Sequence, residues 1–525
     1  MLSLILAAQG RTEEGLGCIE HAIRLEPRLP ALHATRGRIL FLASRYEAAI
    51  AALEQALASD PANPEALHCL ALCLQRLGRL QGAEAVARKA LAVQPAAPDV
   101  LDNLGVILLQ RGDPEAARTC FERALVHADS HPGALANLAL LHEQNNRLDE
   151  AERLARKGLA NNPQAVTLRL VLGRCLRRRS EFAAARQVFE SLGETDVPAL
   201  RKDVAYELGL CADAEGDTDA AFMHTNHANV LVRSMYPQAE QEARGFSELI
   251  ARLQQRFTPE WVAAWQGLSE SGEESSPAFL IGFPRSGTTL LDTMLGAHPE
   301  VTVLEEQASV QSMLACLTAQ VGSYPDALAT LTPADQSVIK HAYRDAIVKP
   351  AGYGKQLLDK SPFNTVHVGL ITRIFPDAPI LFATRHPCDV VLSCFMTNFA
   401  LNSGTAHFTA LGSTVRLYCS VMSLWQTYTQ ILQLNYRLVR YEDLIADPEA
   451  ELREIISFLG LPWSPAVLDH MTHAATRKDV RTASYAQIGH ELYSDARNRW
   501  RRYRKHLEPY LETLQPFCKL FGYDI

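Results

Sequence analysis

Two different arrangements of apolar residues divide the 525-residue chain. Up to about residue 235, apolar and small residues recur at helical spacing, and the whole pattern repeats at a fixed interval. From Ala278 onward, short apolar runs (AFLIGF, QLLD, APILFAT and YRLVRY) alternate with longer helical stretches such as VRLYCSVMSLWQTYTQILQL. This change predicts an all-α repeat array followed by an α/β domain.

The repeat has a period of 34 residues, which five in-phase copies share. Prolines hold one register at Pro27, Pro61, Pro95 and Pro163, with Asp129 in the remaining slot, and a second at Pro30, Pro64, Pro98 and Pro132. Small residues follow at Gly37, Ala71, Gly105, Ala139 and Gly173, and an alanine stands twelve residues after each, at Ala49, Ala83, Ala117, Ala151 and Ala185. A further small position lies at Ala56, Ala90, Ala124 and Gly158.

This pattern resembles the tetratricopeptide repeat, in which each copy is a helix hairpin. The resemblance implies that the small residue of the first helix faces the alanine of the second, because larger side chains would force the helices apart. It also implies that prolines mark the boundaries between hairpins and that the array forms a superhelix with a concave groove. Two uses of the groove stay open: binding a peptide or partner protein, or serving as a scaffold or oligomerisation surface.

The ends of the array are irregular. Gly209, Ala221 and Ala228 repeat the internal spacing after a two-residue slip, so we expect a further copy there. At the start, Gly15 and Ala22 fit a second helix whose partner is squeezed into residues 1–9, which favours a gene start further upstream.

Composition separates the repeats from the second domain. The polar, acidic stretch SESGEESSPAF lacks apolar periodicity and is typical of a linker. We therefore expect a repeat array over 1–235, a connecting helix and linker over 236–277, and the second domain over 278–525. Its alternating strands and helices predict a mostly parallel sheet covered on both faces, with ligands at the C-terminal ends of the strands.

The stretch IGFPRSGTTLLDTML reads as a strand end, a glycine-containing loop and an amphipathic helix. Gly282 and Gly287 keep the spacing of the G-x-x-x-x-G-K-[ST] phosphate loop, but Thr288 stands in place of the lysine and the positive charge comes earlier, at Arg285. Backbone N–H groups and hydroxyls over residues 286–289 can still surround an anion at a helix N-terminus. The loop therefore suits a phosphate but lacks the usual equipment for a triphosphate with magnesium.

A second anion site is indicated by ILFATRHPCDVVLSCF. Arg385 follows an expected strand, and Ser393 lies eight residues later in the next helix. An arginine after a strand is often only a surface ion-pair partner. Two phosphate sites on one sheet nevertheless suit a nucleotide that is phosphorylated at two places.

The combination resembles the sulfotransferases that use 3'-phosphoadenosine 5'-phosphosulfate (PAPS), over about residues 278–525. The stretches PRSGTTLLDTMLGAHPEVTVLEEQ, LLDKSPFNTVHVGLITRIFPDA and LFGYD are similar to those of protein-tyrosine sulfotransferases. An N-terminal repeat array on such a domain is similar to bacterial repeat-containing sulfotransferases. The resemblance implies a P-loop-like α/β fold with PAPS as co-substrate.

The same resemblance implies roles for individual positions. Three would act in catalysis: Glu306 as base, with Glu305 as the less favoured candidate, Lys360 on the bridging oxygen, and Arg285 on the phosphosulfate and the departing charge. The remaining positions would bind the nucleotide: Ser286, Gly287, Thr288 and Thr289 at the 5'-phosphosulfate, Arg385 and Ser393 at the 3'-phosphate, and Tyr441 and Ser484 elsewhere on it.

Four positions depart from the family pattern. They are His490 opposite a tail lysine, Lys478 or Asp479 opposite a transition-state serine, Ala308 in place of a substrate-handling arginine, and Thr397 in place of a nucleotide-contacting arginine. These departures leave the nucleotide assignment standing. They weaken the inference that the acceptor is a peptide tyrosine.

The residue types at these positions suit sulfuryl transfer to a hydroxyl group. A phenol has a pKa of about 10, so a carboxylate such as Glu306 helps to remove its proton. Sulfuryl transfer is an in-line displacement with charge growing on the leaving oxygen, where Arg285 and Lys360 could stabilise it. Because the leaving group is a nucleoside bisphosphate, this argument requires no metal.

Composition narrows the possible binding partners, the possible roles of the cysteines and the cellular location. The net charge of -8 argues against nonspecific nucleic-acid binding. The eleven cysteines contain no C-x-x-C pair, which favours reduced thiols over a disulfide framework or a zinc site. No apolar run reaches the ~20 residues that a membrane span needs, so a soluble, cytoplasmic protein without a membrane partner is expected.

The leading hypothesis is a PAPS-dependent sulfotransferase whose repeats recruit the acceptor, for which a protein tyrosine, a carbohydrate, a lipid and a small molecule stay open. The alternative is a repeat-based scaffold or binding protein with a catalytically inactive nucleotide-binding domain. A P-loop kinase or NTPase is disfavoured by Thr288. A homo-oligomer is compatible with all three.

Overall fold

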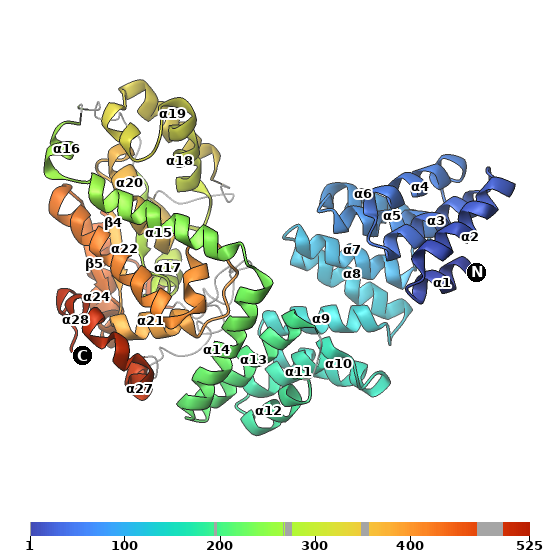
Figure 1. The fold of residues 1–525 in the computed structure, drawn as a ribbon. Helices are drawn as coiled ribbons and strands as arrows, with labels where there is room; N and C mark the ends of the chain where they lie inside the picture. Colours follow the sequence, from blue (N-terminus) through green and yellow to red (C-terminus); the bar gives the residue numbers. More distant parts are fainter. Residues whose placement is uncertain (1, 194–196, 266, 268–275, 348–355, 470–496) are drawn as a thin grey trace. The chain divides into compact units, whose positions relative to one another are not determined.

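The computed structural model describes residues 2–193, 197–265, 267, 276–347, 356–469 and 497–525. The chain forms two compact units, Met1–Glu194 and Thr195–Ile525 (Figure 1). The first unit is entirely helical and the second is built around a parallel sheet, as the sequence predicted.

The first unit is a series of helix hairpins. Its described helices are α1 (Leu2–Ala8), α2 (Thr12–Leu25), α3 (Pro30–Leu42), α4 (Tyr46–Ser59), α5 (Pro64–Arg76), α6 (Leu80–Val93), α7 (Pro98–Gln110), α8 (Pro114–His127), α9 (Pro132–Gln144), α10 (Leu148–Asn161), α11 (Val166–Arg178) and α12 (Phe182–Glu190). The short α1 confirms the squeezed first helix.

The prolines of the second register explain where the first helix of each hairpin begins. Pro30, Pro64, Pro98 and Pro132 each occupy the first position of a helix, where a missing N–H costs nothing. The cap of α5 adds a side-chain bond, because Asn63 accepts from the backbone N–H of Ala66 at 2.9 Å. The prediction that prolines separate the hairpins is confirmed.

The small residues of the first helices meet a different neighbour from the one expected. A Cβ atom added to each glycine would approach a large side chain four residues beyond the alanine: Gly37 against Leu53 at 2.5 Å, Gly105 against Phe121 at 2.4 Å and Gly173 against Phe189 at 2.5 Å. At Gly37 the third nearest atom is the Ala49 carbonyl oxygen, at 3.3 Å. The nearest neighbour of each glycine is therefore a large side chain that the spacing of small residues did not predict.

The other two repeats show the complementary choice. In these two repeats the first helix carries alanine, Ala71 or Ala139, in place of glycine. The facing position of the second helix, which holds leucine or phenylalanine in the other three repeats, then holds Ala87 or Ala155. All four alanines are fully buried. Glycine thus goes with a large partner and alanine with a small one, which keeps the volume between the two helices nearly constant.

The second unit contains a five-stranded, all-parallel sheet. Its strands are β1 (Ala278–Gly282), β2 (Val301–Glu305), β3 (Gln356–Lys360), β4 (Ile380–Thr384) and β5 (Tyr436–Arg440), in the order β2-β3-β1-β4-β5. Four of them match the predicted apolar runs, and β2 was missed. The order puts β1 at the centre, so the loop that follows Gly282 emerges in the middle of the C-terminal edge.

Helices cover both faces of this sheet. The described helices of this unit are α13 (Pro198–Ala214), α14 (Thr218–Met235), α15 (Ala239–Arg256), α16 (Pro259–Ala263), α17 (Thr288–Gly296), α18 (Ser309–Gln320), α19 (Pro333–Asp345), α20 (Val368–Ile374), α21 (Pro387–Phe395), α22 (Leu411–Ile431), α23 (Tyr441–Ala446), α24 (Pro448–Phe458), α27 (Arg504–Leu507) and α28 (Leu511–Leu520), with short 3-10 turns between them.

The central strand divides its side chains between two cores. Phe279 and Ile281 pack with residues of α20, α21 and α22 on one face, and Ala278 and Leu280 pack with α17 and α24 on the other. Both sets are completely buried, which explains the continuous apolar run of the strand.

The expected sixth repeat is the hairpin of α13 and α14, and it belongs to the second unit. Ala221 lies in the same core as the sheet, and the side-chain amide of Asn229 donates to the Phe395 carbonyl at 3.0 Å. The domain limits at residues 235 and 278 stay a prediction. No described helix combines the length and the apolar character that crossing a bilayer demands.

The Gly105–Phe121 contact predicts a non-additive pair of substitutions. Gly105→Ala pushes a methyl group into the ring and should destabilise the repeat unit by about 2 kcal/mol, and Phe121→Ala should cost about 3 kcal/mol through the cavity it leaves. The double variant recreates the alanine pairing of the neighbouring repeats, so it should lose clearly less than the sum.

Urea unfolding followed by far-UV circular dichroism measures these losses. All five tryptophans lie between residues 261 and 500, so their fluorescence reports the second unit and should not change. Gly17→Ala is the matched control, because nothing lies within 4 Å of its added Cβ and a helical alanine should stabilise. Additive losses for the double variant would contradict the volume argument.

Candidate active site

Two glycines shape the loop between β1 and α17. A Cβ atom on Gly282 would lie 2.4 Å from the Ala383 carbonyl oxygen of the neighbouring strand, and Gly287 has a left-handed φ of +97°. Arg285 is also left-handed, with φ 70°, a conformation that costs a non-glycine residue about 1 kcal/mol. These constraints direct the loop along a single path into the N-terminus of α17.

The hydroxyls of this loop are buried. Ser286, Thr288 and Thr289 are each less than a tenth exposed, and the Oγ atom of Ser286 has no hydrogen-bond partner among the described atoms. A buried hydroxyl without a partner is costly in a finished interior but suits a site that receives an oxygen-rich ligand. At the N-terminus of a nine-residue helix, the arrangement fits an anion such as a phosphate.

Lys360, the last residue of β3, is completely buried among three carboxylates. Its Nζ atom is 3.2 Å from Glu305 Oε1, 3.2 Å from Glu306 Oε1 and 3.3 Å from Asp292 Oδ2. The backbone N–H of Glu306 donates to the Lys360 carbonyl at 2.8 Å. Because Asp292 lies on α17 and Glu305 ends β2, one ammonium group connects the helix of the anion loop to two strands.

The protonation of Lys360 results from opposing effects. Burial by itself would lower its pKa, but the negative charges of Asp292, Glu306 and Glu305 outweigh burial and raise the pKa above its usual value. The ammonium group is therefore charged at neutral pH. The two glutamates differ in access, since the Glu306 side chain is 42% exposed and that of Glu305 is 9% exposed.

Asp359, next to Lys360 on β3, faces the other way into the protein. It accepts hydrogen bonds from the hydroxyls of Ser309 at 2.5 Å and Tyr343 at 3.0 Å. Burial raises the pKa of Asp359 to about 6, and the two hydrogen bonds oppose that shift. These bonds hold the end of β3 and, with it, the backbone from which Lys360 projects.

The second predicted anion site adjoins the first. Nε of Arg285 donates to Oγ of Ser393 on α21 at 2.9 Å. The guanidinium group of Arg385 lies 5.0 Å from the ring centre of Tyr441, and that ring also lies against Gly287, where an added Cβ would meet it at 2.7 Å. The structure thus brings these five predicted residues together along the edge formed by β1, β4 and β5.

This second site carries several positive charges. Burial, together with the nearby charges of Arg385 and Arg499, lowers the pKa of Arg285 to about 10. The guanidinium group is still charged at neutral pH. A buried group of arginines that repel each other is stabilised by an anion between them, as expected of a site for a phosphorylated ligand.

Sequence reasoning missed one member of the site, Asp292. The signal was present, because a single charged residue interrupts the apolar positions of TTLLDTML. Ser484 and His490 lie outside the described residues. The catalytic and nucleotide-binding roles of the predicted residues stay predictions that rest on this geometry.

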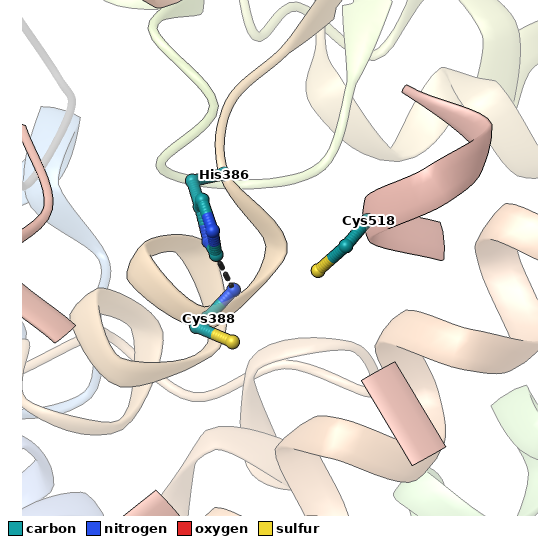
Figure 2. Close-up of side chains that lie close together, drawn as sticks. All are labelled: His386, Cys388 and Cys518. Atoms are coloured by element: carbon teal, nitrogen blue, oxygen red, sulfur yellow. Dashed lines mark hydrogen bonds between the residues drawn. The ribbon is translucent and has the colours of Figure 1, made fainter. Parts of the chain in front are cut away.

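One cluster of potential metal ligands lies beside the site (Figure 2). His386, at the start of α21, lies close to Cys388, and the thiol of Cys518 points toward them from α28; the three ligand atoms are within 4.8 Å of one another. Both ring nitrogens of the histidine already have protein partners: Nδ1 accepts from the Cys388 N–H at 3.2 Å, and Nε2 lies 2.8 Å from the Asp524 carbonyl oxygen. We interpret the cluster as a helix cap with buried thiols packed beside it.

Comparison with protein families agrees with the two-part architecture. Residues 277–465 match the sulfotransferase family, and segments 37–78, 64–125, 103–165 and 137–196 match tetratricopeptide repeats. The chain therefore carries a sulfotransferase-family domain and a series of tetratricopeptide repeats, which confirms the resemblance predicted from the motifs.

Similar curated proteins include protein-tyrosine sulfotransferases. The chain is 30% identical to protein-tyrosine sulfotransferase 2 of Gallus gallus over 37% of this chain and 53% of that protein, and 28% identical to protein-tyrosine sulfotransferase A of Caenorhabditis elegans over 47% and 67%. An uncharacterised protein of Aquifex aeolicus is 29% identical over 70% of this chain and 48% of its own length. The chain thus spans about half the length of the first of these relatives.

Solved structures with some likeness include repeat proteins. They include a tetratricopeptide repeat protein of Parabacteroides merdae, 19% identical with a TM-score of 0.35 over 44% of this chain and 90% of that one. Another is TTC0263 of Thermus thermophilus, 24% identical with a TM-score of 0.30 over 34% and 96%. At such TM-scores the likeness supports no further conclusion.

The Lys360 cluster predicts a strong dependence of stability on its charge balance. Lys360→Met leaves Asp292 and Glu305 buried without their cation and should lower the free energy of unfolding by about 3 kcal/mol. Adding Asp292→Asn should recover part of this loss.

Tryptophan-monitored urea unfolding of the full chain measures both effects. Lys340→Met is the matched control, since Lys340 is also buried in this unit but, among the described residues, it meets the charge of Asp377 without forming an ion pair. Equal losses at Lys360 and Lys340 would show that the carboxylates do not set the cost.

The raised pKa of Asp359 predicts a pH-dependent stability. The folded pKa of about 6 exceeds the unfolded value of 3.8, so the folded state holds this proton more tightly. The stabilisation is present below pH ~4 and is lost as the pH rises through ~6, about 3 kcal/mol in total. Asp359→Asn should remove this slope, so the stability of the variant relative to the wild type should increase between pH 4 and pH 7. A pH-independent difference would contradict the assignment.

Proposed function

We propose that this protein transfers a sulfuryl group from PAPS to a hydroxyl group of an acceptor. The observation that carries the proposal is the convergence of three features on one sheet edge of a sulfotransferase-family domain. These features are the lysine-free anion loop, the Lys360–Glu306 pair and the arginine group at Arg385. Such an edge is where ligands of parallel sheets bind.

The nucleotide would be held at its two phosphates. The backbone and hydroxyls of the first loop suit the 5'-phosphosulfate, and the uncommitted Oγ of Ser286 supports this fit. Arg385 and Ser393 suit the 3'-phosphate, and Tyr441 supports the arginine through its ring. In this proposal PAPS supplies the activated sulfuryl group, while Ser484 adds a contact from outside the described residues.

Glu306 would act as the general base. Its carboxylate is partly exposed, while its backbone N–H and side chain are both bonded to Lys360. It would take the proton of the acceptor hydroxyl as that oxygen forms its bond to sulfur and the bond between sulfur and the 5'-phosphate oxygen breaks. The proton would end on Glu306, and the products would be a sulfate ester and adenosine 3',5'-bisphosphate.

Lys360 and Arg285 would stabilise the charge that develops on the leaving phosphate oxygen. Lys360 is charged and rigidly held, so it needs little reorganisation during the reaction. Arg285 is fixed by its bond to Ser393, which connects the two ends of the proposed nucleotide site.

The proposed acceptor is a protein or peptide hydroxyl, with tyrosine as the first candidate. The supporting observations are the activity for which the relatives are named and the repeats, whose groove we propose recruits the acceptor or a partner. Ala308, where the family has an arginine, leaves carbohydrate, lipid and small-molecule acceptors to be tested beside it. A cytoplasmic location and a homo-oligomer remain predictions from sequence.

The adjacent glutamates provide a matched test of the base. Glu306→Gln should reduce transfer of labelled sulfate from PAPS by about 100-fold or more, because a general base is lost. The affinity for adenosine 3',5'-bisphosphate should stay within about twofold, since that ligand contains neither the sulfuryl group nor the acceptor hydroxyl from which the base takes its proton.

Glu305→Gln is the control, because it also removes a carboxylate from Lys360 but from a less accessible position. It should cost much less activity. Equal losses of activity in the two variants would reject Glu306 as the base. If the wild type binds the nucleotide but transfers sulfate to no member of a broad acceptor panel, the inactive-scaffold alternative is favoured.

A further inference from the structure

The sequence motif LFGYD ends in three residues whose contacts lie next to the proposed nucleotide site. We call Gly522, Tyr523 and Asp524 the GYD segment; it follows α28, the helix that carries Cys518 in Figure 2. The segment packs against two turns, one after β4 at residues 385–386 and one after β5 at residues 440–442.

Tyr523 and Asp524 hold the turn after β4. The hydroxyl of Tyr523 donates to Oε2 of Glu442 at 2.7 Å, and Oε1 of the same glutamate accepts the backbone N–H of His386 at 3.1 Å. The carbonyl oxygen of Asp524 lies 2.8 Å from Nε2 of that histidine. His386 is thus bonded through both its backbone and its side chain.

Gly522 and the ring of Tyr523 hold the turn after β5. Nη2 of Arg440 donates to the Gly522 carbonyl at 3.1 Å, and the guanidinium carbon of that arginine lies 4.5 Å from the Tyr523 ring centre. Each residue of the GYD segment therefore bonds to a residue in one of the two turns.

The two turns hold neighbouring parts of the proposed 3'-phosphate site. Arg385 directly precedes His386, Tyr441 directly precedes Glu442, and the guanidinium group of Arg385 lies over the Tyr441 ring. The GYD segment therefore bonds to His386 and Glu442, the residues that directly follow Arg385 and Tyr441.

The network is buried and its hydrogen-bond direction is defined. Glu442 is 6% exposed and Tyr523 is 9% exposed. Burial, reinforced by the charge of Glu442, raises the pKa of Tyr523, so its hydroxyl stays protonated and donates to the carboxylate. The two carboxylate oxygens of Glu442 each accept one of these hydrogen bonds.

We propose that Tyr523, acting through Glu442 and the His386 backbone, is a positioning residue that holds Arg385 and Tyr441 in the geometry that binds the 3'-phosphate of the nucleotide. This inference rests on the proposed function. It assigns the GYD segment a role in selecting nucleotides that carry a 3'-phosphate.

Tyr523→Phe removes one hydrogen bond and leaves the ring in place. Titration calorimetry with the full chain should show affinity for adenosine 3',5'-bisphosphate about tenfold weaker than in the wild type, the scale typical of bonds that orient a ligand-binding group. Affinity for adenosine 5'-monophosphate should change less than about twofold, because this nucleotide has no 3'-phosphate for Arg385 to bind. Glu442→Gln should produce the same selective loss.

Tyr428→Phe is the matched control, because that buried tyrosine also donates its hydroxyl, to the Val366 carbonyl at 2.9 Å, on an element away from Arg385. It should leave both affinities unchanged. An equal loss for the two nucleotides in Tyr523→Phe, or no loss for either, overturns the positioning role. Wild-type protein that binds neither nucleotide overturns the proposed function, and this inference with it.

Discussion

The buried ammonium group of Lys360 is the interaction on which the catalytic edge depends. A lysine without contact to water keeps its charge only when carboxylates replace the lost hydration. Here they come from β2, from the residue after β2 and from α17, so satisfying one charge joins β3 to a part of the chain that lies 54 to 68 positions earlier. The proposed base and the anion loop are consequently attached to the same atom.

Close backbone approach provides the second constraint. Gly282 lies against the Ala383 carbonyl and Gly287 against the Tyr441 ring, so the anion loop contacts β4 and the first residue after β5. Arg285 then bonds to Ser393 from this loop, which makes the two predicted anion sites into one continuous surface. The Arg285–Ser393 and Arg385–Tyr441 contacts thus lie at the same edge of the sheet as the anion loop.

Much of the architecture was predictable because its signals are local or periodic. The 34-residue period indicated the hairpins, and the loop from Gly282 to Thr288 indicated an anion site. The strand β2 was missed, and Asp292 was missed because its partner is 68 positions away. The contact between Gly105 and Phe121 was also missed, since small-residue spacing does not specify how far one helix slides along the next.

The sequence by itself determined the order of the two parts, the helical hairpins, the anion loop and the residue types available for chemistry. Those features follow from spacing within short segments, where backbone preferences act directly. Only the tertiary structure decided which of the two glutamates is accessible, which charges surround Lys360 and how the GYD segment meets the turns after β4 and β5. Burial and long-range pairing depend on how the strands are ordered in the sheet, and strand order is a property of the whole folded domain.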